Sequence, residues 1–262
     1  MVGSQRRIGA RSLSQVTPEL RDRLERQLEP SSTHVEQMAL DFSTLMRHAL
    51  PDLRGVCDQM REGPFLQRMR RGGRLVWECG GWTSLEAAAA SPSDTVRGWA
   101  AFAVGYVPGL DVGARIDVAR RFAEDEHFAV REWAWLGIRD HVVKNTSSFL
   151  SRLAPLTLDP DPYVRRFAVE VTRPRSVWGA HVPLLVRQPE EGLHILEPLA
   201  NDASRYVQDA VANWLNDAAR VRPEWVREVC AAWLVSHGPS SSRVCRRALR
   251  SLENVTADQP SS

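Results

Sequence analysis

Three acidic residues occupy related places in a phrase that recurs along the chain. Glu132, Glu170 and Asp217 lie two, six and ten residues after a valine that holds the same position in each copy. Helix positions four residues apart lie on one face on successive turns. If neighbouring copies stack in parallel, the three carboxylates converge on one surface, where they can stabilise positive charge. The competing interpretation is that they are ordinary solvated acids among the 32 Asp and Glu residues of the chain.

Arginine and tryptophan are concentrated around these acids. The chain has nine tryptophans, and Lys144 is its only lysine. Arginine forks bind phosphate oxygens, and an aromatic face attracts a cation. Two alternatives stay open, because tryptophan at helical spacing also packs in cores and an arginine excess also follows from a GC-rich genome. The residues concerned are Trp99, Trp133, Trp135, Trp178 and Trp214, with Arg131, Arg165, Arg166, Arg173 and Arg175.

The recurring phrase predicts the fold that must position these side chains. Its valines are 34, 34, 43 and 37 residues apart, a spacing typical of two-helix repeats. A short polar residue before four of the five valines is expected to cap a helix. We therefore expect an all-α fold, a right-handed solenoid of HEAT-like two-helix repeats (an ARM/HEAT-like superhelix). The valines are Val96, Val130, Val164, Val207 and Val244, and the expected caps are Asp94, Asp161, Ser204 and Ser242.

The domain organisation follows from the same pattern. We expect a single HEAT-like-repeat domain over residues 17–253, with flexible tails at 1–16 and 254–262. The helices that precede the recurring phrase are predicted at 114–123, 149–156 and 193–199. Amphipathic helices at 18–29 and 34–49, and helical segments at 66–79 and 85–90, are predicted for the N-terminal third.

Composition excludes several classes of protein. An apolar content of 43 % with 25 % charged residues is that of an ordinary globular chain. Apolar runs fall short of the ~20 residues that cross a bilayer, and no apolar segment follows the N-terminal residues 1–7. The four cysteines have no CxxC spacing, so we expect reduced thiols, a cytoplasmic location and no metal site. No P-loop, GxGxxG or HExxH motif is present, and we expect no cofactor.

Two long segments resemble the alkylpurine DNA glycosylases of the AlkC/AlkD superfamily, and the AlkC type most closely. Residues 163–179 resemble the family stretch RRxxxExTRPRxxW, and residues 195–217 resemble ILExL…DxSxYVRxSVANxLND. The resemblance is close over about 125–235 and architectural before that. Glu170 and Asp217 match motif positions directly. Glu132 matches less closely, because the family's EFAxRPF reads EWAWLGIR here.

The resemblance implies a bacterial base excision repair enzyme that acts in the cytoplasm at the nucleoid. Its substrate would be double-stranded DNA with alkylated bases, from which it would hydrolyse cationic purines such as 3-methyladenine. We expect a monomer that contacts no membrane. The expected catalytic acids are Asp217, Glu170 and Glu132, the base-stacking residues Trp178, Trp214 and Trp133, and the phosphate contacts Arg131, Arg165, Arg166, Arg173 and Arg175.

Departures from the family pattern keep other functions open. Asp209-Ala210 replaces the motif's Arg-Ser, and the basic Lys-Lys-Gly end of the family is absent after Leu252. The alternatives are a non-catalytic HEAT-like scaffold for a protein partner, a DNA-structure binder that lost catalysis, and a glycosylase for bulky natural-product adducts.

Overall fold

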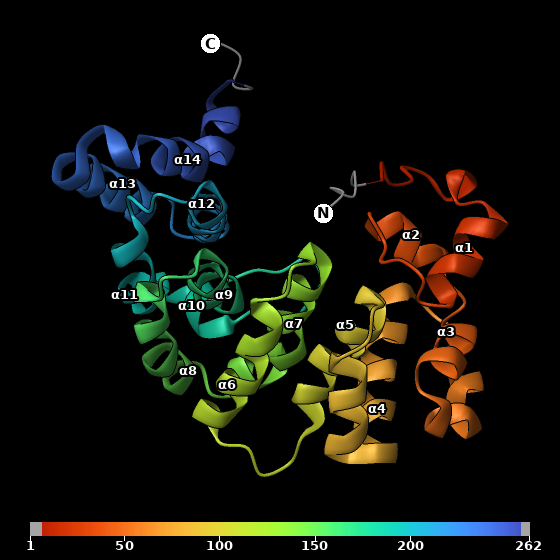
Figure 1. Ribbon diagram of the computed structural model, residues 1–262. Coiled ribbons are helices and arrows are strands. Elements are labelled where there is room, and N and C mark those ends of the chain that lie inside the picture. Colours follow the sequence, from red (N-terminus) through yellow and green to blue (C-terminus); the bar gives the residue numbers. More distant parts are fainter. Residues whose placement is uncertain (1–6, 258–262) are drawn as a thin grey trace. The chain divides into compact units, whose positions relative to one another are not determined.

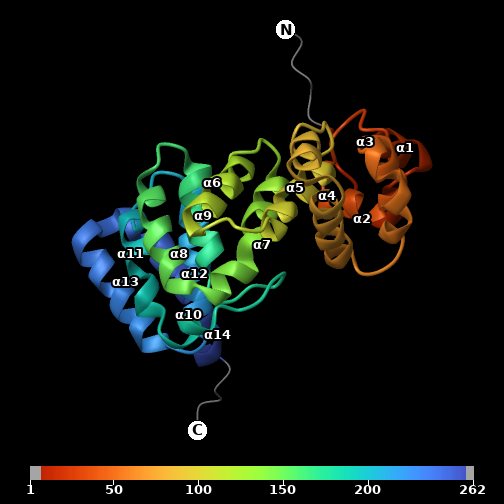
Figure 2. The same ribbon diagram turned by 90° about the horizontal axis from the view of Figure 1, so that it is seen from below.

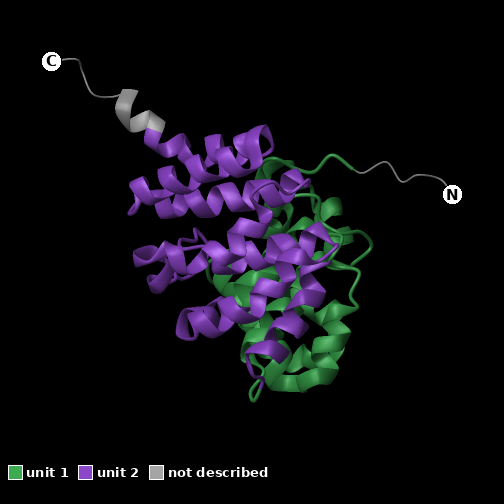
Figure 3. Cartoon of the chain, turned by 90° about the vertical axis from the view of Figure 1, so that its left-hand side faces the viewer, with its two compact units in different colours: residues 1–109, 125–137 green, residues 110–124, 138–262 purple. Residues whose placement is uncertain are grey.

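The computed structural model describes residues 7–257, and within that range it contains α-helices and short 3-10 helices but no strand. The predicted all-α class is confirmed. Contacts group the chain into two compact units, which Figure 3 distinguishes by colour. Unit 1 comprises Met1–Gly109 and Asp125–Gly137, and unit 2 comprises Leu110–Glu124 and Ile138–Ser262. The single domain over 17–253 stays a prediction.

Unit 1 is built from short helices followed by one long helix and its partner. The longest helix, α4, packs against α5, and the two lie side by side in Figures 1 and 2. Helix α7 begins in unit 1, and the division between the units falls inside it. The helices are α1 (Pro18–Glu25), α2 (His34–Ala39), α3 (Phe42–Ala49), the 3-10 helix η2 (Pro51–Met60), α4 (Phe65–Ala89), α5 (Asp94–Ala103) and α7 (Phe128–Lys144).

Three helix predictions for unit 1 differ from the structure, and in the first of them α1 ends at Glu25 rather than at residue 29. The helix expected over 34–49 is two helices, because the Asp41 carboxylate accepts hydrogen bonds from the backbone N–H groups of Ser43 and Thr44 and starts a new helix. The segments expected at 66–79 and 85–90 join into α4. Gly81 kinks this helix with a φ of 53°, a conformation that favours glycine.

The described part of the predicted N-terminal tail is packed. Ala10 and Val16 are buried, and the Ala10 N–H donates to the buried Glu36 carboxylate at 2.7 Å. Residues 7–16 therefore contact the rest of unit 1 through these groups, and the flexible tail stays a prediction. At the other end α14 reaches Ala257, so residues 254–257 of the predicted tail are helical. Residues 1–6 and 258–262 lie outside the described residues.

Unit 2 contains the last three copies of the recurring phrase, on α9, α12 and α14. Helix α12 packs against α9, α13 and α14, and α6 packs against α8 and α9 (Figure 1). Each first helix begins within three residues of its predicted start. The helices are α6 (Val112–Ala123), α8 (Thr146–Leu153), α9 (Pro162–Thr172), α10 (Pro183–Arg187), α11 (Leu193–Leu196), α12 (Arg205–Ala219), α13 (Pro223–His237) and α14 (Ser242–Ala257).

The recurring valines form the core of the second helices, whereas the expected caps differ among copies. All five valines are fully buried. Asp161 caps α9 as predicted, by accepting from the Tyr163 N–H at 2.7 Å. Asp94 does not cap α5, because its buried carboxylate accepts from the N–H and hydroxyl of Ser31 instead. Ser204 makes no capping hydrogen bond with its side chain, and Ser242 is the first residue of α14. Hydrophobic periodicity, not capping, is thus the shared feature of the repeat.

Three buried tryptophans pack against glycines of preceding elements. A Cβ at Gly72 would lie 2.5 Å from the Trp99 ring, one at Gly98 2.6 Å from Trp133, and one at Gly192 2.5 Å from Trp214. The missing side chain on each glycine therefore makes room for an indole ring. Such packing fixes the spacing of neighbouring helices within a unit.

No helix in residues 7–257 combines the length and the apolar character that crossing a membrane requires.

We predict that Gly137→Ala destabilises the protein although alanine favours helices. A Cβ at Gly137 would lie 2.3 Å from the Ala101 carbonyl oxygen within unit 1, so the backbone must move. Overpacking of this kind costs ~1–3 kcal/mol, against a helix-propensity gain of ~1 kcal/mol. The measurement is urea unfolding, with Gly55→Ala as the control because no atom lies within 4 Å of its Cβ position. Equal stability of the two variants would contradict the close approach.

Candidate active site

Two of the three predicted acids meet around one arginine in unit 2. Glu170 lies near the end of α9 and Asp217 lies on the adjacent helix α12. The Arg173 guanidinium donates to Asp217 Oδ2 at 2.9 Å through Nε and to Glu170 Oε2 at 3.3 Å through Nη1. Glu170 is buried and Asp217 is nearly so, with 12 % of its side chain exposed. Packing of successive second helices thus brings the two carboxylates to one guanidinium.

The third predicted acid, Glu132, belongs to unit 1. Glu132 lies on α7, where its carboxylate accepts a hydrogen bond from Trp135 Nε1 at 3.0 Å. Its predicted convergence with Glu170 and Asp217 stays a prediction.

Burial and charge oppose each other at the acid pair. Burial raises the pKa of the Asp217 carboxyl above its ordinary value, against the opposing charge of Arg173. Burial disfavours the charge of Arg173, but Glu170 and Asp217 outweigh it and raise the pKa of Arg173. Arg166 approaches Glu170 Oε1 at 3.2 Å and lies 4.2 Å from the centre of the Tyr206 ring. Two guanidiniums therefore face two carboxylates.

A second arginine, which the sequence analysis did not assign to the site, holds the backbone around the acids. Arg139 is fully buried, and it donates to the carbonyls of Val171 at 2.8 Å, Ala180 at 2.9 Å and Arg173. Burial lowers its pKa to about 10. Its three bonds join the end of α9 to the segment that follows. The available signal was a lone arginine directly after the apolar run of residues 133–138.

The segment after α9 carries the only predicted base-stacking residue with an accessible ring. Trp178 is 41 % exposed and its neighbour Val177 is 92 % exposed. The Ser176 hydroxyl accepts from the N–H groups of Trp178 and Gly179, and the Val182 N–H donates to the Pro174 carbonyl. These bonds fold residues 174–182 into a closed loop that presents the two apolar side chains to solvent.

The other two predicted stacking residues are core residues. Trp133 and Trp214 are 1 % and 0 % exposed, and Trp214 Nε1 donates to the Thr172 carbonyl at 3.1 Å. The base-stacking role predicted for them is therefore wrong for this conformation, because no ring face is open. Each of these two rings is buried against a glycine, Gly98 for Trp133 and Gly192 for Trp214, and this packing could not be read from residue type alone.

The predicted phosphate-binding arginines have different environments. Arg165 donates to both oxygens of Asp202, at 2.7 and 3.0 Å, and to the carbonyls of Asp159 and Pro160. Its donors are occupied, so the predicted phosphate contact does not fit it. Arg131 donates to the carbonyls of Asp125 and Glu126. Arg166 and Arg173 face the acids, whereas Arg175 borders an open hollow.

That hollow lies directly beside Asp217. Its volume is about 160 Å³, below the ~300 Å³ at which drug-sized ligand pockets begin. One edge of a base or sugar fits such a space better than a whole nucleotide. Its lining consists of Arg173, Arg175, Ser176, Val177, His181, Asp217 and Arg220. His181 and Arg220 were not predicted, because neither belongs to the recurring phrase.

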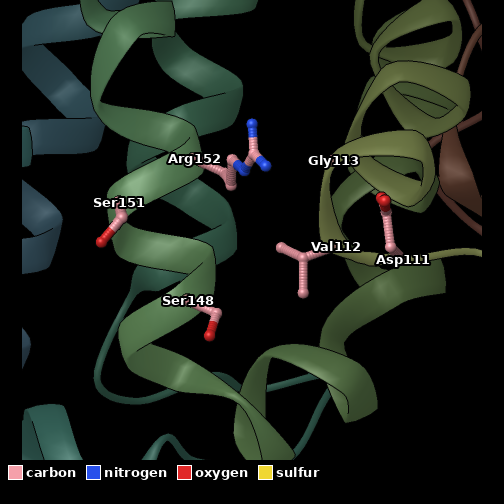
Figure 4. A pocket seen from close by; sticks show the side chains of 6 residues that line it. All are labelled: Asp111, Val112, Gly113, Ser148, Ser151 and Arg152. Atoms are coloured by element: carbon pink, nitrogen blue, oxygen red, sulfur yellow. The ribbon is translucent and has the colours of Figure 1, made fainter.

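A second hollow in unit 2 lacks paired acids. It lies between the start of α6 and helix α8, and its volume is about 410 Å³ (Figure 4). Its only carboxylate, Asp111, caps α6 by accepting from the Ala114 N–H at 2.8 Å. Within the described part of the chain, no cluster of three or more His, Cys, Asp or Glu side chains could hold a metal ion.

Comparison with known proteins finds a family similarity in the segment that contains the acid pair. Residues 130–252, slightly less than half of the chain, match the family described as DNA alkylation repair enzyme. The matched DNA alkylation repair segment includes Glu132, Glu170 and Asp217, and the match confirms the resemblance that the motifs indicate.

A curated relative covers part of the same segment. The uncharacterized protein YhaZ of Bacillus subtilis (strain 168) is 32 % identical over 127 residues, which are 48 % of this chain and 35 % of YhaZ. The chain therefore spans about a third of the length of this relative.

Two solved structures resemble this chain in fold. The alkylpurine DNA glycosylase AlkC of Pseudomonas fluorescens, bound to DNA containing an abasic site analog, has a TM-score of 0.67 at 23 % identity; the match covers 94 % of this chain and 66 % of AlkC. The protein smu.31 of Streptococcus mutans UA159 has a TM-score of 0.58 at 21 % identity, over 70 % of this chain and 90 % of that protein. This likeness confirms the HEAT-like helical fold.

We predict that Arg139→Met lowers the free energy of unfolding by about 3 kcal/mol, because buried carbonyls left without a donor cost ~1–3 kcal/mol each. Arg139→Lys should lose less stability, because one ammonium can still donate hydrogen bonds to some of the three carbonyls. Denaturant unfolding measures both. The control is Arg227→Met on the exposed face of α13, where a change within about 0.5 kcal/mol is expected. A loss no larger than that of the control would contradict the role of Arg139.

Proposed function

We propose that this chain is a DNA glycosylase that hydrolyses the N-glycosidic bond of alkylated, cationic purines such as 3-methyladenine in duplex DNA, as a step of base excision repair in the cytoplasm. The observation that carries the proposal is the pair Glu170 and Asp217, held by Arg173 beside an open hollow. It is supported by the family match of the segment and by the fold shared with AlkC, which is an alkylpurine DNA glycosylase.

The chemistry follows from where charge moves during the reaction. Alkylation of a ring nitrogen makes the base cationic, so the bond to C1′ breaks with its electron pair going to the base, which leaves neutral. Positive charge then develops on the sugar. A carboxylate beside C1′ stabilises that charge, and it can accept a proton from the water whose oxygen bonds to C1′. We assign this role to Asp217, with Glu170 as the supporting acid.

Discrimination for cationic bases is assigned to Trp178. Its exposed ring lies in the loop whose neighbouring residues line the hollow. A cation–π contact contributes ~0.5–2 kcal/mol, which favours a charged base over a neutral one by about 2- to 30-fold.

A second candidate function is DNA binding without catalysis. It is favoured by the ion pairs themselves, because Arg173 occupies both acids in this conformation. Catalysis requires that substrate or phosphate competes for that guanidinium. The two candidates differ in one result, the release of a base from bound DNA.

The decisive experiment is base release from methylated duplex DNA. We expect the wild type to free 3-methyladenine, detected by mass spectrometry, and Asp217→Asn to lose at least 100-fold of the rate, about 2.7 kcal/mol of transition-state stabilisation. Its DNA affinity should stay within about threefold. Glu228→Gln on the exposed face of α13 is the control and should retain full activity. If the wild type binds DNA but releases no base, the glycosylase proposal fails and DNA binding without catalysis takes its place.

The raised pKa of Asp217 predicts an acid limb in the pH profile. The carboxylate is the active form, so the rate of base release falls as the pH drops through the pKa of Asp217. That pKa lies above the ~3.9 of an ordinary Asp. Arg173→Gln removes the charge that opposes burial, so the limb should move up by about 1 unit or more. Where release is too slow, ¹³C NMR of the carboxyl gives the same titration. An unchanged or lowered pKa in Arg173→Gln would refute the assignment.

A further inference from the structure

The charges around the acid pair fall into a balanced inner group and an unbalanced outer group. In the inner group, Arg166 and Arg173 face Glu170 and Asp217. The outer group consists of Arg175, Arg220 and Arg250. Within the described residues, none of the three outer arginines forms an ion pair.

Each outer arginine is placed by contacts that leave its charge uncompensated. Arg175 lines the hollow, and its Nε is buried without a hydrogen-bond partner. Arg220 follows directly after α12, lines the same hollow and is exposed. Arg250 on α14 donates to the carbonyl of Arg247 and to Asn213 Oδ1 at 3.0 Å. These neutral acceptors orient its guanidinium but do not neutralise it.

Arg175 and Arg220 line the same hollow beside Asp217, and the charges of Arg220 and Asp217 both act on Arg250. Asp217 experiences the charges of Arg220 and Arg175. Partial burial and the like charges of Arg247, Arg173 and Arg220 lower the pKa of Arg250, against the attraction of Asp217. Like charges so close repel one another, and an anion relieves that repulsion. The inner carboxylates relieve this repulsion only in part, since they already form ion pairs with Arg166 and Arg173.

We propose that Arg175, Arg220 and Arg250 form a phosphodiester-binding site that seats one backbone phosphate of the lesion-bearing strand next to Asp217. The inference rests on the proposed function and adds the contact that aligns the strand with the acid. Guanidinium forks match phosphate oxygens in geometry and stay charged at every relevant pH. A phosphate fixed here places the adjoining sugar beside the carboxylate that stabilises its charge.

Salt dependence of DNA binding tests the site. Each neutralised phosphate contributes about −0.9 to the slope of log Kobs against log [salt] on duplex DNA. Because the arginines share one phosphate, the double variant Arg220→Gln/Arg250→Gln should reduce the slope by about 1 rather than 2. The probe is a duplex with an uncleavable abasic site analogue. Arg227→Gln, an exposed α13 arginine paired with Glu224, should leave the slope unchanged.

A neutral phosphate scan identifies the contact itself. Methylphosphonate, which has no charge, is placed at single positions on either side of the abasic analogue. One position should weaken wild-type binding by about tenfold, and the same substitution should cost the double variant nothing further. Additive losses at every position, or an unchanged salt slope, would overturn the inference.

These readouts are independent of catalysis. If the wild type releases no base yet the scan shows one shared position, the proposed activity fails and the phosphate site stands. If base is released and the scan shows no shared position, the activity stands and the phosphate site fails.

Discussion

The candidate active site depends on a single buried guanidinium. Arg139 carries its charge in the core of unit 2, where its hydrogen-bond partners are the carbonyls of Val171, Arg173 and Ala180. A helix ends in carbonyls without partners and with partial negative charge, so the end of α9 is a suitable place for such a cation. Glu170 and Asp217 also favour the charged form of Arg139. The same charge thus orders the loop backbone and supports the acids.

The sequence predicted those parts of the fold that depend on local periodicity. The buried valines and the helices that carry them follow from the spacing of the recurring phrase. The placement of Glu170 and Asp217 on neighbouring second helices follows from offsets that differ by four residues. Features set by distant residues were missed. The burial of Trp214 depends on Gly192. The Asp94 carboxylate accepts a hydrogen bond from Ser31 instead of capping its own helix. A pattern within one helix contains no information about which residue lies opposite.

The arginines show the same limit. Arg97 and Arg165 each follow a core valine, and each donates to carbonyls five and six residues earlier and to both oxygens of an Asp in a later loop, Asp125 and Asp202 respectively. This repeated bond set joins loops within each unit and accounts for part of the arginine content. An arginine at this place in the phrase is structural, whereas Arg220, which lies outside the phrase, is exposed to solvent.

Some arginines are structural and others are accessible to solvent. Because the two kinds are separate, one small region can stabilise both a positive and a negative charge. During the proposed reaction positive charge leaves the base and appears on the sugar, while the phosphates stay negative. A carboxylate near the sugar and guanidiniums near a phosphate both stabilise that state, but only if they cannot collapse onto each other. Arg173 alone bridges both acids, and Arg250 is held on α14 by neutral acceptors. Neutral acceptors thus orient Arg250 while Arg173 pairs with the acids, so that in the proposed reaction each group can act on its own part of the nucleotide.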